Sequence, residues 1–283
     1  MFKTFEGWGL IMRDIGSTIK ASRVALGLSQ AELAAGVCAQ SMISGLENGK
    51  YVPNAALLLA LAQRLNIDVN SISLARGYLV SHEPKINATC HQLCNGHRYA
   101  ELGKFLRQQT VLDNLESAVQ TQAYYYYLAV SQYHARDFDS ALASLKLAMA
   151  EANLSHLSTL SRLCLISVAL VCSEKGHWSQ ALTALNSAIS DLKTVAYEEN
   201  LHVLYYLSAL IYFKHGEVER AFLTITDGIT LIVAHDSHYM LANCYFLLAE
   251  LAIRMQKGDL AHTARTRSRV LEDIYRDGIY KDF

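Results

Sequence analysis

The stretch GLSQAELAAGVCAQSMISGLENGK, residues 27–50, predicts two short helices joined by a tight turn. Ser29 stands three positions before Glu32, which is the spacing of a capping box at the start of a helix. The turn is expected at residues 36–39, where a glycine opens the break between the two helical patterns. The fold of the N-terminal part of the chain is therefore decided within this stretch.

The second helix is expected to begin at Gln40 or Ser41 and to end at Asn48. Ile43 and Leu46 lie three positions apart, so they share a face that packs inward while the opposite side chains point outward. Such a helix pair can place the start of its second helix in the DNA major groove, with the first helix across the phosphates. A helix pair that only packs is the alternative.

This geometry assigns candidate DNA contacts to both helices. Glutamine can pair with adenine and methionine can contact a thymine methyl group, whereas residues that flank the helices would position phosphates. The candidates for base contact are Gln40, Ser41, Met42, Ser44 and Gly45, and those for phosphate contact are Ser29, Gln30, Lys50 and Tyr51.

Charge and composition restrict the function classes. The chain has 283 residues, of which 52% are hydrophobic and 18% charged, so it can bury a substantial core. Its net charge is -1, so binding to double-stranded DNA must come from a local surface. Residues 12–76 carry six Lys and Arg against four Asp and Glu, a weak excess, and we therefore expect a homodimer on DNA.

No metal, cofactor or catalytic centre is expected. The six cysteines are scattered as buried thiols in a reducing compartment would be, and Cys90, His91, Cys94 and His97 lack a second pair at zinc spacing. The chain has no phosphate loop or nucleophile motif, so we do not expect an enzyme. No uninterrupted apolar run of about 18 residues occurs, so we expect a cytoplasmic protein without a membrane segment.

The chain after Pro84 has no further proline and carries Ala, Leu and Tyr at helical spacing. The segment around Gly77 breaks this pattern and marks a boundary. We expect an all-α chain with a helix-turn-helix domain of the five-helix type at residues 12–75, a linker at 76–87 and a helical-repeat domain at 88–283.

Small residues recur every 40 positions in the second domain, which predicts stacked helical hairpins that approach closely at these positions. The first set is Ala129, Ala169, Ala209 and Ala249; the second is Ala141, Ala181, Ala221 and Ala261; the third is Ala148, Ala188 and Gly228, with Leu145, Leu185 and Ile225 between the last two sets. Gly96, Gly176 and Gly216 recur at the expected turns, where a left-handed residue is often needed, and Arg136 and Gln256 fill the remaining turns.

The repeats resemble degenerate tetratricopeptide repeats, on the evidence of Tyr125, Leu128 and Ala129 before the turn and Ala141 and Leu145 after it. HEAT-type repeats are the alternative. Either kind would form an α-solenoid with a concave groove. LSQAELA and ISGLENG resemble the repressor-type helix-turn-helix family, and the combination resembles the PlcR/Rgg-like (RRNPP) peptide-pheromone regulators of Gram-positive bacteria.

This resemblance implies that the groove binds a short signalling peptide and that binding re-angles a dimer of DNA domains, as in quorum sensing. Mapping the groove positions gives Tyr126, Ile166, Tyr206 and Phe246, then Val130, Leu170, Leu210 and Glu250, then His134, Glu174, Lys214 and Arg254. The resemblance also favours Asn243, at the outer end of its helix, as a partner of the peptide backbone.

Simpler roles remain for several of these residues. Tyr126 belongs to a run of four tyrosines, some of which must pack in the core, and Glu250 and Arg254 are spaced to pair at the surface. The function expected is a DNA-binding transcription regulator controlled by a peptide. The alternatives are a repeat scaffold for protein partners that is tethered to DNA, and a repressor that responds to a ligand other than a peptide.

Overall fold

The computed structural model describes residues 16, 19–51, 53–65, 77–150, 152, 157–275 and 278–281. The chain divides into two compact units, residues 1–74 and 75–283. Within the described ranges every regular element is a helix, so the all-α fold class is confirmed. None of the described helices combines the length and the apolar character that crossing a membrane would require.

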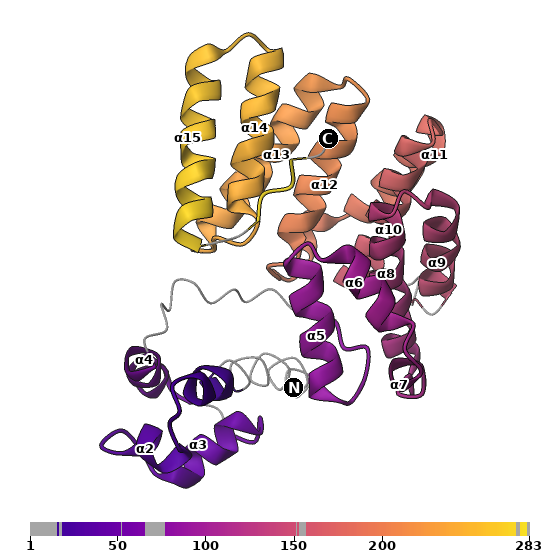
Figure 1. Cartoon of the computed structure of the whole chain (residues 1–283). Helices are drawn as coiled ribbons and strands as arrows, with labels where there is room; N and C mark the ends of the chain where they lie inside the picture. The colour runs from indigo at the N-terminus through magenta and orange to yellow at the C-terminus, as the bar shows by residue number, and fades with distance from the viewer. Residues whose placement is uncertain are drawn as a thin grey trace. The chain divides into compact units, whose positions relative to one another are not determined.

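The N-terminal unit is a small bundle (Figure 1). Residues 19–25 are helical, and they are followed by α2 (Gln30–Ala34), α3 (Gln40–Glu47) and α4 (Ala55–Arg64). Their shared core includes Ile19, Leu33, Ile43, Leu46 and Leu61, all buried. The predicted five-helix type depends in part on residues 66–75, which lie outside the described residues.

Local signals start the helices as the sequence predicts. The backbone N–H of Glu32 donates to Ser29 Oγ at 3.1 Å, and the N–H of Ser29 donates to Glu32 Oε2 at 2.7 Å, so the capping box is confirmed. The helix α3 begins at Gln40, and its Ile43 and Leu46 are fully buried, which confirms the inward face. Asn54 caps α4 in the same way, because its Oδ1 accepts from the backbone N–H of Leu57 at 2.8 Å.

Helical hairpins build the second unit (Figure 1). The pairs are α5 (Pro84–Asn95) with α6 (Tyr99–Leu106), α8 (Ala118–His134) with α9 (Phe138–Ala150), α10 (Thr159–Glu174) with α11 (Trp178–Ile189), α12 (Leu201–Lys214) with α13 (Val218–Ala234), and α14 (Leu241–Arg254) with α15 (Gly258–Tyr275). The short helix α7 (Gln109–Leu112) and the 3-10 helix η2 (Leu192–Thr194) lie in the connections.

The turns inside the hairpins keep the 40-residue period from the second hairpin onward, at 135–137, 175–177, 215–217 and 255–257. Each contains a left-handed residue, with φ of 59° at Arg136, 74° at Gly176, 83° at Gly216 and 57° at Gln256. In the first hairpin turn, the left-handed residue lies one position later than the 40-residue period predicts. Gly96 has a φ of -79°, so the prediction of a left-handed Gly96 is wrong, and His97 adopts the left-handed conformation instead, with a φ of 56°.

The small residues of the 40-residue pattern are buried between helices, as predicted. Ala169, Ala209 and Ala249 have no exposed surface. Gly228 shows the same constraint most sharply, because a Cβ atom there would lie 2.8 Å from Cβ of Tyr205. Close approach of neighbouring helices therefore depends on these positions.

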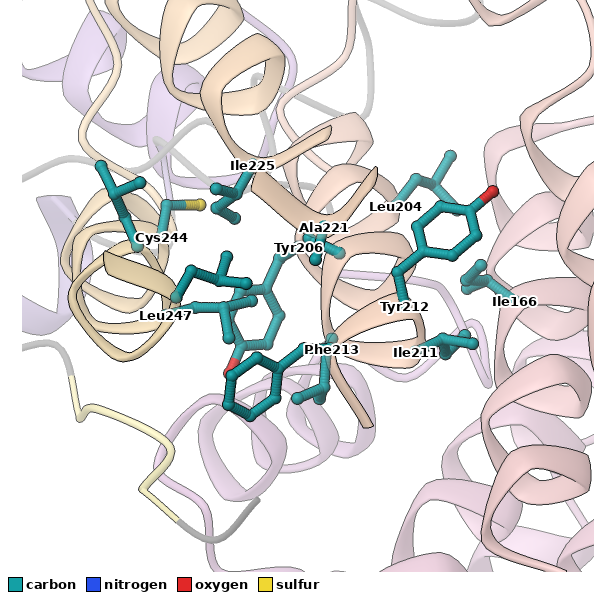
Figure 2. Packing of buried hydrophobic residues seen from close by; sticks show 14 of the residues in the cluster. Ile166, Leu204, Tyr206, Ile211, Tyr212, Phe213, Ala221, Ile225, Cys244 and Leu247 are labelled. Carbon is teal, nitrogen blue, oxygen red and sulfur yellow. The ribbon is translucent and has the colours of Figure 1, made fainter. Parts of the chain in front are cut away.

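A hydrophobic cluster with buried residues from α10 to α15 forms the centre of the second unit (Figure 2). The helix α12 supplies Leu204, Tyr206 and Ile211, while Ile225 comes from α13 and Leu247 from α14, and all are buried. A second cluster, with Val80, Leu102 and Leu145 among its members, holds α5, α6, α8 and α9 together.

The linker expected at residues 76–87 differs from the structure over residues 77–87. Val80 is fully buried in the second cluster, and its N–H donates to Asn87 Oδ1 at 2.8 Å. The helix α5 already begins at Pro84, which occupies the first turn of a helix without losing a hydrogen bond. Sequence periodicity missed this packing because the segment is not helical before α5 starts, so its buried residues follow no helical spacing.

Candidate functional site

The exposed start of α3 carries the residues expected to read DNA. Gln40 and Ser41 are exposed, whereas Met42 and Ser44 are half-buried, and Met42 packs against the core of the N-terminal unit. The N-cap residue is Ala39, whose side chain makes no capping hydrogen bond. The first turn of α3 thus presents polar side chains and backbone N–H groups together, an arrangement that suits contact with DNA.

A chain of hydrogen bonds sets the position of Gln40. Its Nε2 donates to Gln30 Oε1 at 2.7 Å, and Gln30 Nε2 donates to Glu47 Oε2 at 2.8 Å. Arg23 completes the chain, because its Nε and Nη2 donate to the two carboxylate oxygens of Glu47 at 2.6 and 2.9 Å. The start of α2, the start of α3 and the end of α3 are therefore fixed to one another by side chains.

Glu47 is the electrostatic anchor of this arrangement. Burial alone would raise the pKa of Glu47, but hydrogen bonds from Arg23 and Gln30 and the positive charge of Arg23 outweigh it and lower the pKa. Sequence reasoning missed both Arg23 and Glu47 as supports of the site. A usable signal was present, since Glu47 ends a helix directly after the inward-facing Leu46.

Gly45, Lys50 and Tyr51 form the far side of the same face. A Cβ atom on Gly45 would lie 3.1 Å from Cβ of Tyr51, so the glycine allows the half-buried tyrosine to pack against α3. Lys50 is exposed, and its backbone N–H donates to the carbonyl of Gly45 at 2.7 Å. We call the polar set of half-buried Gln30 and exposed Gln40, Ser41 and Lys50 the DNA face.

The structure separates the expected groove residues into two kinds. Ile166, Leu170 and Leu210 are buried in the central cluster, and Ile166 offers no exposed surface to a ligand. Tyr126 and Val130 of α8 are half-buried, and the ring of Tyr126 meets the ring of Tyr78 edge-on at 6.0 Å.

The charged residues expected at one end of the groove form pairs within the repeats. Lys214 Nζ lies 2.7 Å from Glu174 Oε1, and the hydroxyl of Tyr133 donates to the same oxygen at 3.0 Å. The guanidinium of Arg254 lies 4.0 Å from the centre of the Phe213 ring. Glu174 and Lys214 are thus tied to each other across α10 and α12.

Phe246 and Glu250 of α14 both contact Arg265 of α15. The guanidinium of Arg265 lies 4.3 Å from the centre of the Phe246 ring and donates a hydrogen bond to Glu250 Oε1. The pairing of Glu250 with Arg254 that their spacing allowed is therefore replaced by a pairing between neighbouring helices. Phe246 and Glu250 lie where α14 meets α15.

Asn243, near the start of α14, binds the backbone of a non-helical segment. Its Nδ2 donates to the carbonyl of Gly278 at 3.3 Å, and its Oδ1 accepts from the N–H of Tyr280 at 2.8 Å. The backbone belongs to residues 278–281, which follow α15 and which we call the post-helical segment. Sequence reasoning selected Asn243 but missed this segment.

Two imidazoles complete the surroundings of the post-helical segment. His97 Nε2 lies 3.2 Å from the carbonyl oxygen of Gly278, and the ring of His134 meets the ring of Tyr280 edge-on at 5.7 Å. His134, one of the expected groove residues, also stacks on Tyr99 with ring centres 3.5 Å apart. We call Asn243, His97 and His134 the backbone site.

A buried hydroxyl and an open pocket lie close to the backbone site. Tyr206 is 3% exposed, and its hydroxyl has no hydrogen-bond partner among the described residues. Burial raises the pKa of Tyr206 well above its ordinary value, and repulsion from neighbouring groups that include Tyr280 adds to the shift. A pocket of about 420 Å³ is lined by His97, Tyr99, His134 and residues 279–281, among others. Polar atoms and free volume are thus available together here.

The cysteines behave as structural thiols in the described chain. Burial raises the pKa of Cys90 and of Cys164 to about 12, so neither is a ready thiolate. Among the described residues no group of three or more His, Cys, Asp or Glu side chains is placed to hold a metal ion.

Known proteins resemble the chain in one domain by sequence and along almost all its length by fold. Residues 19–72 match the helix-turn-helix family model, and no curated protein matches the chain. The Bacillus thuringiensis PlcR structure with the peptide PapR7 and DNA is 18% identical, with a TM-score of 0.59 over 93% of this chain and 96% of that one. Its apo form is 16% identical, with a TM-score of 0.54 over 93% and 95%.

The apo form of the competence regulator ComR from Streptococcus vestibularis is 12% identical, with a TM-score of 0.45 over 93% of each chain. The resemblance seen in the sequence is confirmed for the N-terminal domain and for the fold. Residues 19–72 form a DNA-binding domain of the helix-turn-helix type, and the chain has the fold of PlcR.

Proposed function

We propose that the chain is a cytoplasmic transcription regulator whose repeat unit binds a short signalling peptide and thereby changes DNA binding by the N-terminal unit. The observation that carries this proposal is the pairing of both amide atoms of Asn243 with the backbone of a non-helical segment. An asparagine that accepts from one backbone N–H and donates to one carbonyl recognises the main chain of a peptide, independent of its side chains.

The DNA face supports the other half of the proposal. Gln40 is exposed at the start of α3, and its side chain is pre-positioned by Gln30 and Glu47. A glutamine held in this way can pair with a base edge at little entropic cost, while Lys50 can contact phosphate. Because the charge excess in this unit is small, we propose that two copies of the chain bind DNA as a homodimer.

Tyr78 offers a route by which the peptide can act on the segment that leads into the repeat unit. Its hydroxyl accepts from Asn200 Nδ2 at 2.9 Å, and its backbone N–H donates to the hydroxyl of Tyr127 at 3.1 Å. Tyr78 also meets Tyr126, an expected groove residue, edge-on. A peptide that displaces Tyr126 would therefore disturb the residues just after the DNA-binding domain.

The test is a band-shift titration of the full chain on the DNA upstream of its own gene. Synthetic peptides from neighbouring small open reading frames are added at increasing concentration. We expect one of them to change the DNA affinity at micromolar concentration or below, and Asn243→Ala to remove this change while it retains DNA binding. The exposed Asn95 of α5 provides the matched control, since Asn95→Ala should keep the response.

A second pair of variants tests the DNA face. We expect Gln40→Ala to weaken DNA binding about tenfold, which is the scale of one lost bidentate base contact. The exposed Gln63 of α4 is the control, and Gln63→Ala should leave the affinity unchanged. DNA binding that ignores every peptide would exclude peptide control, and a chain that binds no DNA would favour the scaffold for protein partners.

A further inference from the structure

The post-helical segment is held as a ligand would be. The carbonyl of Gly278 accepts from both Asn243 and His97, which lie 35 and 181 residues away in the chain. The N–H of Tyr280 is paired with Asn243 as well. Three backbone contacts thus come from opposite ends of the repeat unit and meet on residues 278–280.

Hydrogen bonds orient the imidazole of His97. A carbonyl oxygen can only accept, so Nε2 of His97 donates to the carbonyl of Gly278. Its Nδ1 lies 2.8 Å from the hydroxyl of Tyr99, a group that can donate or accept. Tyr99 therefore holds the ring of His97 so that Nε2 faces the backbone of the post-helical segment.

His97 is also the left-handed residue of the first hairpin turn, one position later than the 40-residue period predicts. The first hairpin turn places a histidine in the left-handed region, with a φ of 56°, where two of the later turns have glycine. A non-glycine residue in this region costs free energy, and such costs often accompany a functional constraint. Here the displaced turn brings an imidazole to the carbonyl of Gly278.

The contacts select particular residue types along the segment. A Cβ atom on Gly278 would lie 2.9 Å from Cδ2 of His97, so this position accepts glycine without moving the imidazole. Two residues later, the ring of Tyr280 lies against His134 and packs on the central hydrophobic cluster. The backbone site therefore fits the pattern glycine, any residue, aromatic residue.

We propose that the backbone site recognises an extended peptide with the pattern glycine-x-aromatic, and that the chain's own residues 278–281 occupy it as a tethered competitor of that peptide. This inference rests on the proposed function, because it takes the groove to be the peptide site. Figure 1 shows the yellow trace of the post-helical segment passing beside α14, as the contacts of Asn243 require.

Tethering explains why such a segment would regulate binding. Only two residues separate α15 from Gly278, so the segment is presented to the site at an effective concentration on the order of millimolar. A free peptide must exceed this competition to bind, so the response occurs only above a threshold concentration. The pocket of about 420 Å³ beside Tyr280 provides space for a peptide to begin binding before the segment leaves.

Hydrogen exchange of the full chain tests occupancy directly. We expect the amide of Tyr280 to be protected, and Asn243→Ala to reduce its protection about tenfold, since a hydrogen bond of this kind is lost. Asn95→Ala on α5 and the exposed Ile274→Ala on α15 should leave the protection unchanged. An amide of Tyr280 that exchanges at the rate of an unstructured peptide would overturn the inference.

A binding experiment with the full chain tests competition. The probe is a labelled, end-blocked peptide with the sequence of residues 276–283, RDGIYKDF. We expect it to bind the Tyr280→Ala chain about tenfold more tightly than the unaltered chain, because the internal competitor is weakened. A matched peptide with valine in place of its glycine should bind about tenfold more weakly, because of the contact with His97.

The two proposals fail in different ways. Equal binding of the peptide to the unaltered, Tyr280→Ala and Asn243→Ala chains would overturn the tethered competitor, whatever the neighbouring peptides do to DNA affinity. Protection of Tyr280 and selective binding of the probe would support it, even if no neighbouring peptide changed DNA affinity and the proposed function failed.

Discussion

The DNA face and the backbone site are built over very different distances along the chain. Gln30 and Gln40, which bond to each other on the DNA face, are 10 residues apart, whereas His97 and Gly278 are 181 residues apart. The DNA face therefore needs only α2, α3 and the helix of residues 19–25, which supplies Arg23 to the buried ion pair. The backbone site needs the whole stack of hairpins to keep its spacing, so errors in helix packing anywhere between its ends can disturb it.

The first prediction tests whether the DNA face depends on its buried ion pair. The side chain of Glu47 is 1% exposed and that of Arg23 is 11% exposed. Glu47→Ala leaves the Arg23 charge without its partner, and we expect a loss of about 3 kcal/mol of stability in the N-terminal unit. Hydrogen exchange of α2 and α3, compared with α10 and α12, measures the loss and its location.

The control for this change is Glu32→Ala, which removes half of the exposed capping box. It should cost about 1 kcal/mol or less. If Glu47→Ala raised exchange in α10 and α12 as much as in α2 and α3, the distinction between a locally built face and a site that depends on the whole stack would be lost.

The second prediction concerns acid, to which the two regions should respond in different pH ranges. His202 is fully buried, and this burial lowers its pKa to about 4, while its Nδ1 faces the carbonyl of Tyr239 and its Nε2 faces the hydroxyl of Tyr197. The unfolded chain binds the proton first, at an ordinary pKa of about 6.5. Stability is therefore lost as the pH falls from about 6.5 to about 4, by about 3 kcal/mol in total.

Urea unfolding of the repeat unit at a series of pH values measures this loss. His202→Asn should flatten the dependence over that range, whereas the exposed His262→Asn should preserve it. Glu47 should affect the stability of the N-terminal unit at lower pH, because its pKa is below the ordinary value for glutamate. Its stabilising contribution is fully present above the ordinary pKa, and it disappears only as the pH falls through the lowered pKa. A single common pH range for both units would contradict the account.

The third prediction addresses close packing of the hairpins. Ala209 has no exposed surface and lies on the 40-residue pattern, so Ala209→Leu must push neighbouring helices apart and should cost about 2 kcal/mol. Ala143→Leu, on the exposed side of α9, is the matched control and should be nearly neutral. Thermal unfolding measures the two stability losses, and equal losses at the two positions would contradict the packing account. The RDGIYKDF binding assay would show whether Ala209→Leu also weakens peptide binding.

The smallest effects are expected at the turns. Gly176 has a φ of 74° with open space around it, so Gly176→Ala should cost about 1 kcal/mol through backbone strain alone. Arg136 adopts the same conformation at a φ of 59°, and Arg136→Gly should change stability by about 1 kcal/mol or less in the favourable direction. Chemical unfolding measures the change in unfolding free energy for each variant. Changes of opposite sign for Gly176→Ala and Arg136→Gly would support a common turn geometry, and changes of the same sign would contradict it.

The sequence predicted the features that depend on local or periodic patterns. The spacing of Ser29 and Glu32 predicted the start of α2, and the recurrence of alanine at 169, 209 and 249 predicted helices in close contact. Both signals work because a helix start and a small-residue contact each impose a residue type at a fixed spacing.

The remaining features arise from contacts between distant parts of the chain. The sequence around Glu47 does not indicate that Arg23 is its ion-pair partner. Likewise, the sequence around Asn243 does not indicate that its side chain bonds to the carbonyl of Gly278. His97 was obscured by Gly96, the residue that the glycine pattern favoured for the left-handed position. A one-residue shift in the first turn is too small to detect from spacing, yet it decides which side chain reaches the backbone site.

The measurement that tests the account most directly follows both regions in one titration of the full chain. A peptide from a neighbouring small open reading frame is added while the affinity for labelled upstream DNA and the exchange rate of the Tyr280 amide are recorded together. The account predicts that DNA affinity changes over the same peptide concentrations at which Tyr280 loses protection, and that Asn243→Ala abolishes this coupling. Release of Tyr280 without any change in DNA affinity would contradict the claim that the groove controls the DNA face.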